Sequence, residues 1–315
     1  MQKANVTTIP TSAIVDLSAA TGPVAVKMTN DYLFRALLQC NNRVLKGLIR
    51  SLLHLSLEEI TSVEITNPIE LGTSVHEKEF ILDIKVKLNS SVIINLELQV
   101  INERNWVNRS TCYLCRTYSS LNHGDDYNTA KPVIQIGLLD FTLFPEHPEF
   151  YATYKLINEK NFSVYSDKLR LSVVDLTHID LATEDDRLHE IDLWASFFKA
   201  TTWEELKMLA HNNTDIQEAI ATVYQLTQEE KIRRQCEARE DYYRRQNDVQ
   251  RWIKKQDDTI QQQNQLIEQQ AETIAQLNKK IGQQNDTIAQ QDKKIDMLAD
   301  EICELRNLIT QLQQR

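Results

Sequence analysis

Nine isoleucines, each seven residues after the last, run through the final fifth of this 315-residue chain. They are Ile253, Ile260, Ile267, Ile274, Ile281, Ile288, Ile295, Ile302 and Ile309. A strict seven-residue repeat of apolar side chains is the pattern of a left-handed coiled coil. It predicts a long C-terminal helix that pairs with other helices, and it confines any globular domain to the residues before it.

The residues three places after each isoleucine bear on how such helices would pair. These d positions are Gln256, Gln263, Gln270, Leu277, Gln284, Gln291, Leu298, Leu305 and Leu312. Isoleucine at a with leucine at d favours a parallel dimer, but the glutamines leave a trimer open. A lone solvated helix or a disordered Gln-rich segment are the alternatives. Because nine isoleucines in water would form a costly apolar stripe, we expect self-association.

Composition shifts divide the chain into four segments. We expect a flexible N-terminal arm over 1–25, an α/β domain over 26–227, a basic helical linker over 228–255 and a coiled-coil segment over 256–315. In the linker, Tyr242, Tyr243 and Trp252 interleave with arginines and lysines. That stretch fits either a phosphate backbone or a solvated helix face.

Helical and alternating patterns follow one another through 26–227. We expect a helix that begins at Thr29 or Asn30 and breaks near Asn41, and helices over 103–122 and 184–210. We expect strands over 60–67, 132–141 and 162–175, and a hairpin over 80–100. Glycine and proline, six of each, are too scarce for an all-β sandwich. This order indicates a mixed α/β fold.

The hairpin, FILDIKVKLNSSVIINLELQV, carries the candidate chemistry. A three-residue loop over 89–91 would place Asp83 directly across from Glu97, on the polar face that strand alternation produces. The two carboxylates would then be within reach of one ion. One alternative is a solvated ladder of ion pairs that involves Lys85. The other is a loop that is longer or shorter by one residue, which would move Glu97 to the opposite face from Asp83.

Other classes of function find little support. A net charge of −10 does not by itself indicate nucleic-acid binding. Cys112 and Cys115 form a single CxxC without further zinc ligands, so we expect both to be buried helix residues. The seven histidines show no ligand spacing, and no GxSxG, Walker or dinucleotide motif occurs. Without a signal pattern or an apolar run of membrane-spanning length, we expect a cytoplasmic protein with no membrane partner.

Six stretches together resemble the PD-(D/E)XK family transposases, also called recombination-promoting nucleases. They are MTNDYLFRALL, FILDIKVKL, INLELQV, NRSTCYLCRTYSSLNHGDDY, PVIQIGLLDFTLFPE and EIDLWASFFKATTWEELKMLA. The resemblance covers about residues 27–210. It implies a restriction-endonuclease-like mixed sheet flanked by helices, and metal-dependent cleavage of DNA.

The resemblance also implies roles for individual residues. Asp83 and Glu97 would bind Mg²⁺, with Mn²⁺ as a substitute, and the main-chain oxygen of Leu98 would add a ligand. Asp31 would be a further acid, unless it only caps its helix. The family places a lysine two residues after the glutamate, where this chain has Gln99, so Lys85 on the same face would replace that cation.

The helix after the hairpin would contact DNA. Arg109 would hold a phosphate, with Tyr113 and Tyr118 beside it unless the tyrosines only pack. The sequence thus predicts a Mg²⁺-dependent DNA endonuclease that its coiled coil oligomerises. The alternative is a catalytically degenerate nuclease-fold binding module scaffolded by the coil, which the glutamine at position 99 and the acidic charge favour.

Overall fold

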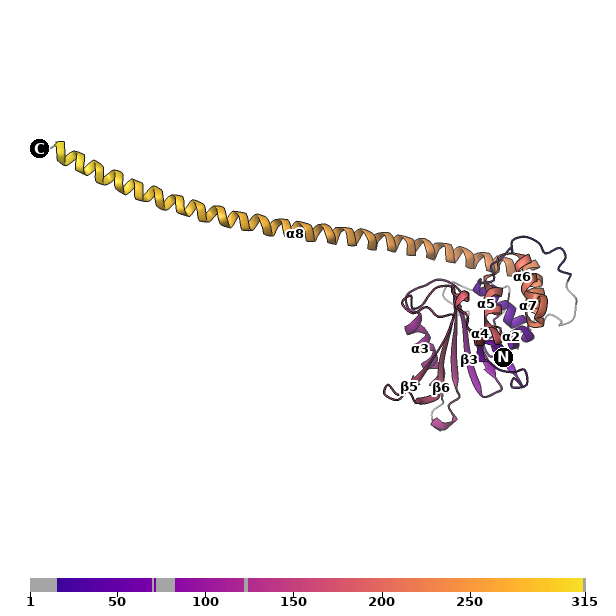
Figure 1. Cartoon of the computed structure of the whole chain (residues 1–315). Coiled ribbons are helices and arrows are strands. Elements are labelled where there is room, and N and C mark those ends of the chain that lie inside the picture. The colour runs from indigo at the N-terminus through magenta and orange to yellow at the C-terminus, as the bar shows by residue number, and fades with distance from the viewer. Residues whose placement is uncertain (1–15, 70, 72–82, 122–123, 314–315) are drawn as a thin grey trace. The chain divides into compact units, whose positions relative to one another are not determined.

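A six-stranded mixed sheet organises the first of two compact units, residues 1–247 and 248–315 (Figure 1). The computed structural model describes residues 16–69, 71, 83–121 and 124–313. The strands are β1 (Val63–Ile65), β2 (Ile84–Leu88), β3 (Val92–Gln99), β4 (Val133–Leu139), β5 (Tyr151–Ile157) and β6 (Val164–Asp175). Their order is β1-β2-β3-β4-β6-β5, with β3–β4 and β4–β6 parallel and the other pairs antiparallel.

Helices lie on both faces of this sheet (Figure 1). The α-helices of the chain are α1 (Asp31–Cys40), α2 (Asn42–Leu53), α3 (Trp106–Tyr118), α4 (Glu184–Leu188), α5 (Ile191–Lys199), α6 (Trp203–Leu209), α7 (Thr214–Gln228) and α8 (Glu230–Gln313). Helix α3 packs on β4 and β6, whereas α1 packs on β3 and α2 on β1. Every residue of β4 is buried as a result. The expected mixed sheet with flanking helices and a long C-terminal helix is confirmed.

The turn between β2 and β3 sets the register on which the hairpin prediction depends. Asn89 and Ser90 both have positive φ, as a type I′ turn requires, and the Ser91 amide donates to the Leu88 carbonyl at 3.1 Å. The Asn89 side chain also accepts from the amides of Thr61 and Ser62. Leu88 therefore pairs with Val92, and Ile84 with Leu96. The expected three-residue loop is confirmed.

Several helix boundaries follow from capping side chains. The Asn30 side chain caps α1 and that of Asn41 caps α2, so the expected break near Asn41 is confirmed. Thr202 and Glu205 form a capping box at α6, which divides the helical stretch expected over 184–210. The sequence prediction missed β5 and α7. The strand expected over 162–175 is the single strand β6.

Parts of the expected N-terminal arm and of the CxxC motif differ from their sequence interpretation. Residues 20–24 contact α6, because the Trp203 amide donates to the Gly22 carbonyl at 2.9 Å. Residues 1–15 of the arm lie outside the described residues, as do residues 80–82 of the hairpin. Cys112 and Cys115 are both exposed on α3, so the prediction that they are buried was wrong.

The second unit is the part of α8 that follows Asn247. Its isoleucines from Ile260 to Ile309 are each more than half exposed in the single chain. The expected helix is therefore confirmed, while its pairing into a coiled coil stays a prediction. Among the helices of the described residues, none has the length and apolar character to cross a membrane.

Candidate active site

Two carboxylates face one cavity where the β2–β3 hairpin opens away from its turn. Glu97 lies on β3, and Asp83 directly precedes β2, one pair beyond the match of Ile84 with Leu96. Both line a cavity of about 170 Å³. Alternation along the strands turns the neighbouring Ile84, Leu96 and Leu98 toward the core, so the acids lie on the other face.

Glu97 is only 6 % exposed, and its Oε2 atom has no hydrogen-bond partner. Burial, and next the nearby charge of Asp83, raise the pKa of Glu97 to about 8, although Arg109 opposes this. Burial also raises the pKa of Asp83. Near neutral pH the two groups cannot both be ionised at low cost, because each charge disfavours the other. The positive charge of Arg109 only partly offsets this repulsion.

Asp83 is anchored through its main chain. Its carbonyl oxygen accepts hydrogen bonds from the guanidinium of Arg35 and, at 2.9 Å, from the Asn67 side chain. Arg35 projects from α1 and is completely buried, and burial lowers its pKa to about 10. The Asn67 side chain also accepts from the amide of Lys85 at 2.8 Å. Strand β2 thus begins at a fixed place opposite Glu97.

Arg109, from α3, joins the acid to the residue that replaces the family's lysine. Its Nη2 donates to Glu97 Oε1 and to Gln99 Oε1, each at 2.5 Å, and its Nη1 lies 3.2 Å from Glu103 Oε2. The Gln99 amide nitrogen donates to the Ile101 carbonyl at 2.8 Å, which fixes the side chain. Gln99 therefore binds a cation from another element at the place where a lysine would supply one.

A glycine on β4 determines where Arg109 can lie. Gly137 pairs with Glu97 in the sheet, and a Cβ at Gly137 would overlap the ring of Trp106. The buried Trp106 ring packs across the strand there, and the Arg109 guanidinium lies over it, 5.5 Å from the ring centroid. The small residue thus lets the first turn of α3 approach the sheet and bring Arg109 to the acids.

Asp31, in the first turn of α1, meets the beginning of α8. Both its oxygens pair with Arg239, with Nε to Oδ1 at 2.8 Å, and both side chains are about nine-tenths buried. The amide of Asp31 donates to the Tyr243 hydroxyl at 3.3 Å. Asn30 is the helix cap, so capping does not account for Asp31. Its carboxylate lines the cavity beside Asp83 but already has a cationic partner.

The donor set fits a hard divalent cation. Mg²⁺ and Mn²⁺ take oxygen ligands, commonly from one or two carboxylates, with water and substrate oxygens completing the shell. The buried and unpartnered Oε2 of Glu97 faces a cavity that also contains Asp83 and Asp31. A cation there would offset both the desolvation of the acids and their mutual repulsion.

Of the remaining residues expected at the site, some line the cavity and others do not. Leu98 and Tyr113 line the cavity, and burial raises the pKa of Tyr113, as do Asp83 and Glu97. Lys85 and Tyr118 are not among the described residues that line the cavity. Tyr118 is the last residue of α3. The structure thus gathers Asp31, Asp83, Glu97, Leu98, Gln99, Arg109 and Tyr113 in one place.

Sequence reasoning missed the contribution of α8. Arg239, Tyr242 and Tyr243 line the cavity, and the Arg239 guanidinium lies 4.6 Å and 5.1 Å from the centroids of the two tyrosine rings. They belong to the segment expected to be a linker. The available signal was the arginine–tyrosine composition of that segment, which fits a phosphate backbone or a solvated helix face equally well. Arg35, a lone arginine in an apolar helix, was also overlooked.

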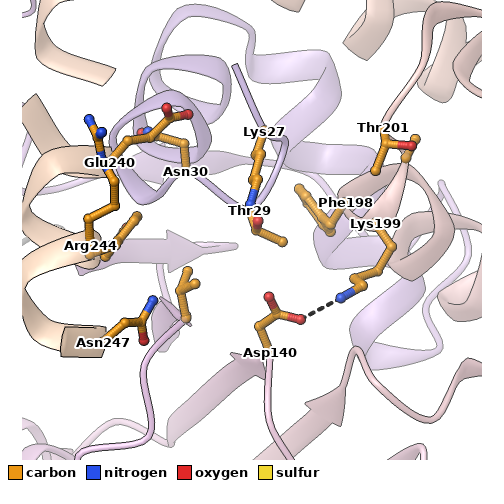
Figure 2. A pocket seen from close by; sticks show the side chains of 13 residues that line it. Lys27, Thr29, Asn30, Asp140, Phe198, Lys199, Thr201, Glu240, Arg244 and Asn247 are labelled. Carbon is orange, nitrogen blue, oxygen red and sulfur yellow. Dashed lines mark hydrogen bonds and ion pairs between the residues drawn. The ribbon is translucent and has the colours of Figure 1, made fainter. Parts of the chain in front are cut away.

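A second cavity, of about 360 Å³, adjoins the first, and Val100 and Tyr243 line both (Figure 2). Figure 2 shows Lys27, Lys199 and Arg244 around it, and Lys199 Nζ donates to Asp140 at 2.6 Å. Thr29, Phe198 and Thr201 also line it. Three basic side chains and the two acids Asp140 and Glu240 therefore line the space next to the acidic pair.

The region of the chain that contains the acidic cavity matches a known protein family. The model of the PD-(D/E)XK nuclease family transposase matches residues 28–256, which include every residue of the acidic cavity. No curated protein and no solved structure matches the chain. Since the matched region exceeds half of the sequence and ends beyond Arg239 and Tyr243, the chain belongs to the PD-(D/E)XK nuclease family transposases.

Proposed function

We propose that this chain is a divalent-metal-dependent DNA endonuclease, in which Asp83 and Glu97 hold Mg²⁺ or Mn²⁺. The observation that carries the proposal is the buried acid pair, with the pKa of Glu97 raised to about 8 and its Oε2 unpartnered. The Arg109 guanidinium does not fully compensate the two acids, and the pair has the oxygen ligands that a hard cation takes. Family membership supports a nuclease or transposase-like role.

The bound cation would polarise the phosphate and promote ionisation of the attacking water. Each protein group has a separate task. Arg35 and Asn67 hold the main chain of Asp83, so that its carboxylate stays opposite Glu97. Arg109, which Gln99 orients, offers positive charge to the phosphate that is cut. Tyr113 stays protonated because its pKa is raised, and its hydroxyl donates to a phosphate oxygen.

The second cavity, of about 360 Å³, would contact DNA on either side of the cut. Lys27 and Arg244 face the space next to the acids and would contact the phosphates that flank the cut (Figure 2). The overall negative charge does not oppose this, because local clusters of basic groups govern the approach of a polyanion.

Plasmid cleavage tests the proposal most simply. The purified full chain should nick supercoiled plasmid with Mg²⁺ or Mn²⁺ and not with EDTA. Asp83→Asn and Glu97→Gln should each lower the rate at least about a hundredfold, because loss of one ligand removes most of the metal-assisted chemistry. Glu64→Gln, at the exposed position of β1, is the matched control and should nick plasmid at the wild-type rate. Unchanged nicking by Asp83→Asn would refute the assignment.

A binding module without catalysis is the second candidate, and one observation favours it. Two guanidiniums already neutralise acids of the cavity: Arg109 at Glu97 and Arg239 at Asp31. In a degenerate site these pairs would replace the metal permanently. Calorimetry with Mn²⁺ separates the candidates, because an active site should bind the ion and lose that binding in Glu97→Gln, whereas a degenerate site should bind none.

A further inference from the structure

A separate cluster of three ligand-bearing side chains lies where α2 ends and α4 turns into α5. It consists of His54, Asp185 and His189, and one donor atom from each lies within 4.8 Å of the others. Among the described residues, this is the one group of histidine, cysteine and acidic side chains that meets this condition. None of the three lines the acidic cavity. The cluster therefore has no part in the proposed cleavage reaction.

The geometry of the cluster converges on the Asp185 carboxylate. His54 Nδ1 lies 3.2 Å from Asp185 Oδ2, and His189 Nδ1 lies 3.4 Å from Asp185 Oδ1. Ligands at ~2.1 Å from a tetrahedral zinc ion are roughly 3.4 Å apart, so these spacings are those of neighbouring ligands. Both imidazoles present the same nitrogen to the same carboxylate.

The two rings are stacked, with centroids 4.1 Å apart and planes 12° from parallel. Stacked imidazolium ions would repel each other, so the arrangement favours neutral rings. A neutral imidazole has a lone pair that a metal ion can bind.

The surrounding helices and hydrogen bonds fix the cluster. Asp186 is not an available ligand, because its Oδ2 accepts from the amide and hydroxyl of Thr183 in the capping box of α4. Asp185 lies in α4 and His189, four residues further on, is the C-cap of that helix, whereas His54 is the C-cap of α2. Nδ1 of His189 also lies 2.9 Å from the Asp185 carbonyl oxygen, and a metal ion bound at Nδ1 would replace this hydrogen bond.

We propose that His54, Asp185 and His189 form a second metal site, selective for Zn²⁺ or a similar transition-metal ion, that ties α2 to the α4–α5 turn. Two imidazoles and one carboxylate suit zinc, cobalt or nickel, whereas Mg²⁺ prefers oxygen ligands alone. The carboxylate is 62 % exposed, so a water molecule can reach the ion as a fourth ligand. The site is independent of the nuclease proposal, because a catalytically inactive chain would keep it.

Titration of the full chain with Zn²⁺ and with Co²⁺ tests the site. An Asp83→Asn/Glu97→Gln background prevents metal bound at the acidic cavity from being counted. In that background we expect one Zn²⁺ ion per chain by native mass spectrometry and a visible absorption band from bound Co²⁺. Zn²⁺ should also raise the melting temperature, whereas Mg²⁺ should not.

Single substitutions then assign the ligands. His54→Ala, His189→Ala and Asp185→Asn should each weaken Zn²⁺ binding at least about tenfold. His211→Ala, at an exposed histidine outside the cluster, should leave it unchanged. Circular dichroism of each variant shows whether it has folded, and Asp185→Asn keeps the size of the side chain and an oxygen acceptor. A chain that binds no Zn²⁺, or whose His189→Ala variant binds it as tightly, would overturn the proposal.

Nuclear magnetic resonance gives a test that needs no substitution. In protein labelled with ¹⁵N-histidine, Zn²⁺ should shift two Nδ1 resonances and leave the other histidines in place. A shift confined to histidines other than these two would also overturn the assignment, whatever the plasmid assay shows.

Discussion

At the scale of single residues, Glu97 should lower the stability of the metal-free protein. Its pKa is about 8 in the folded chain against an ordinary value of 4.5, so the folded state binds the proton more tightly than the unfolded state does. The resulting loss of stability is absent below about pH 4.5. It grows between about pH 4.5 and pH 8 and is complete above about pH 8. Glu97→Gln should therefore stabilise the metal-free chain by about 1–3 kcal/mol at pH 8 and hardly at pH 4.5.

Thermal unfolding in EDTA at several pH values measures this effect. Glu103→Gln removes another carboxylate that contacts Arg109, but one that is more exposed, and should change stability little at any pH. Added Mn²⁺ should raise the melting temperature of the wild type and not that of Glu97→Gln. A Glu97→Gln variant that is less stable than the wild type at pH 8 would contradict the raised pKa.

The pairing of Asp83 with Glu97 followed from the sequence because it needs only alternation and the length of one loop. The partners of other site residues did not follow. Arg239 is 208 residues from Asp31, and no local pattern links the two. His54 and His189 likewise meet only through the fold, so the linear spacing of the histidines gave no indication of a cluster. Long-range pairs of this kind depend on tertiary packing.

At the scale of elements, the first turns of α8 belong to the active site. Arg239→Ala would leave Asp31 buried and unpaired, which should destabilise the protein by about 3 kcal/mol. The same change frees a third carboxylate in the cavity, so divalent ions should bind more tightly. We therefore expect a lower melting temperature in EDTA and a larger rise with Mn²⁺ than the wild type shows.

Arg234→Ala is the matched control for this prediction. Arg234 lies on the same helix and pairs with Glu230 on an exposed surface, where an ion pair contributes little. Its melting temperature and Mn²⁺ response should equal those of the wild type. An Arg239→Ala variant that is as stable as the wild type would show that the buried pair does not hold α8 against α1.

The contact of α3 with β4 depends on Gly137. Gly137→Ala should push Trp106 from the strand, lower stability by about 1–3 kcal/mol and slow cleavage, because Arg109 would move with α3. Adding Trp106→Phe, which removes the ring atoms nearest the new methyl group, should restore part of both losses. Denaturant unfolding of the two single variants and the double variant measures this coupling. Strictly additive losses would contradict the proposed contact.

An apolar pattern made most elements predictable, but not all of them. Strand β4 was found because its apolar run is buried on both faces. Strand β5 was missed because its residues are mostly exposed, so no apolar pattern marks it. Helix α7 was missed although it packs against α1 and α2 and its buried Ile216, Ala219, Ile220, Val223 and Leu226 repeat at helical spacing.

At the scale of the whole molecule, the proposed reaction must account for both strands of DNA. A single acidic cavity would cut one strand at a time, whereas two associated chains would place one site at each strand. The heptad isoleucines of α8 offer the means of association, because they are exposed in the single chain and form one stripe. The nuclease domain and the repeat thus have complementary roles in the proposal.

Substitutions in the full chain test this link between assembly and product. Ile267→Asp with Ile302→Asp puts charges into the stripe and should yield a monomer by light scattering. Gln265→Asp with Asn307→Asp adds the same charges at the outward f positions and should leave the oligomer intact. The wild type and the control should convert supercoiled plasmid to linear DNA, while the monomer should accumulate nicked circles at a similar initial rate. A monomeric variant that still produces linear DNA as fast as the wild type would show that each chain cuts both strands alone.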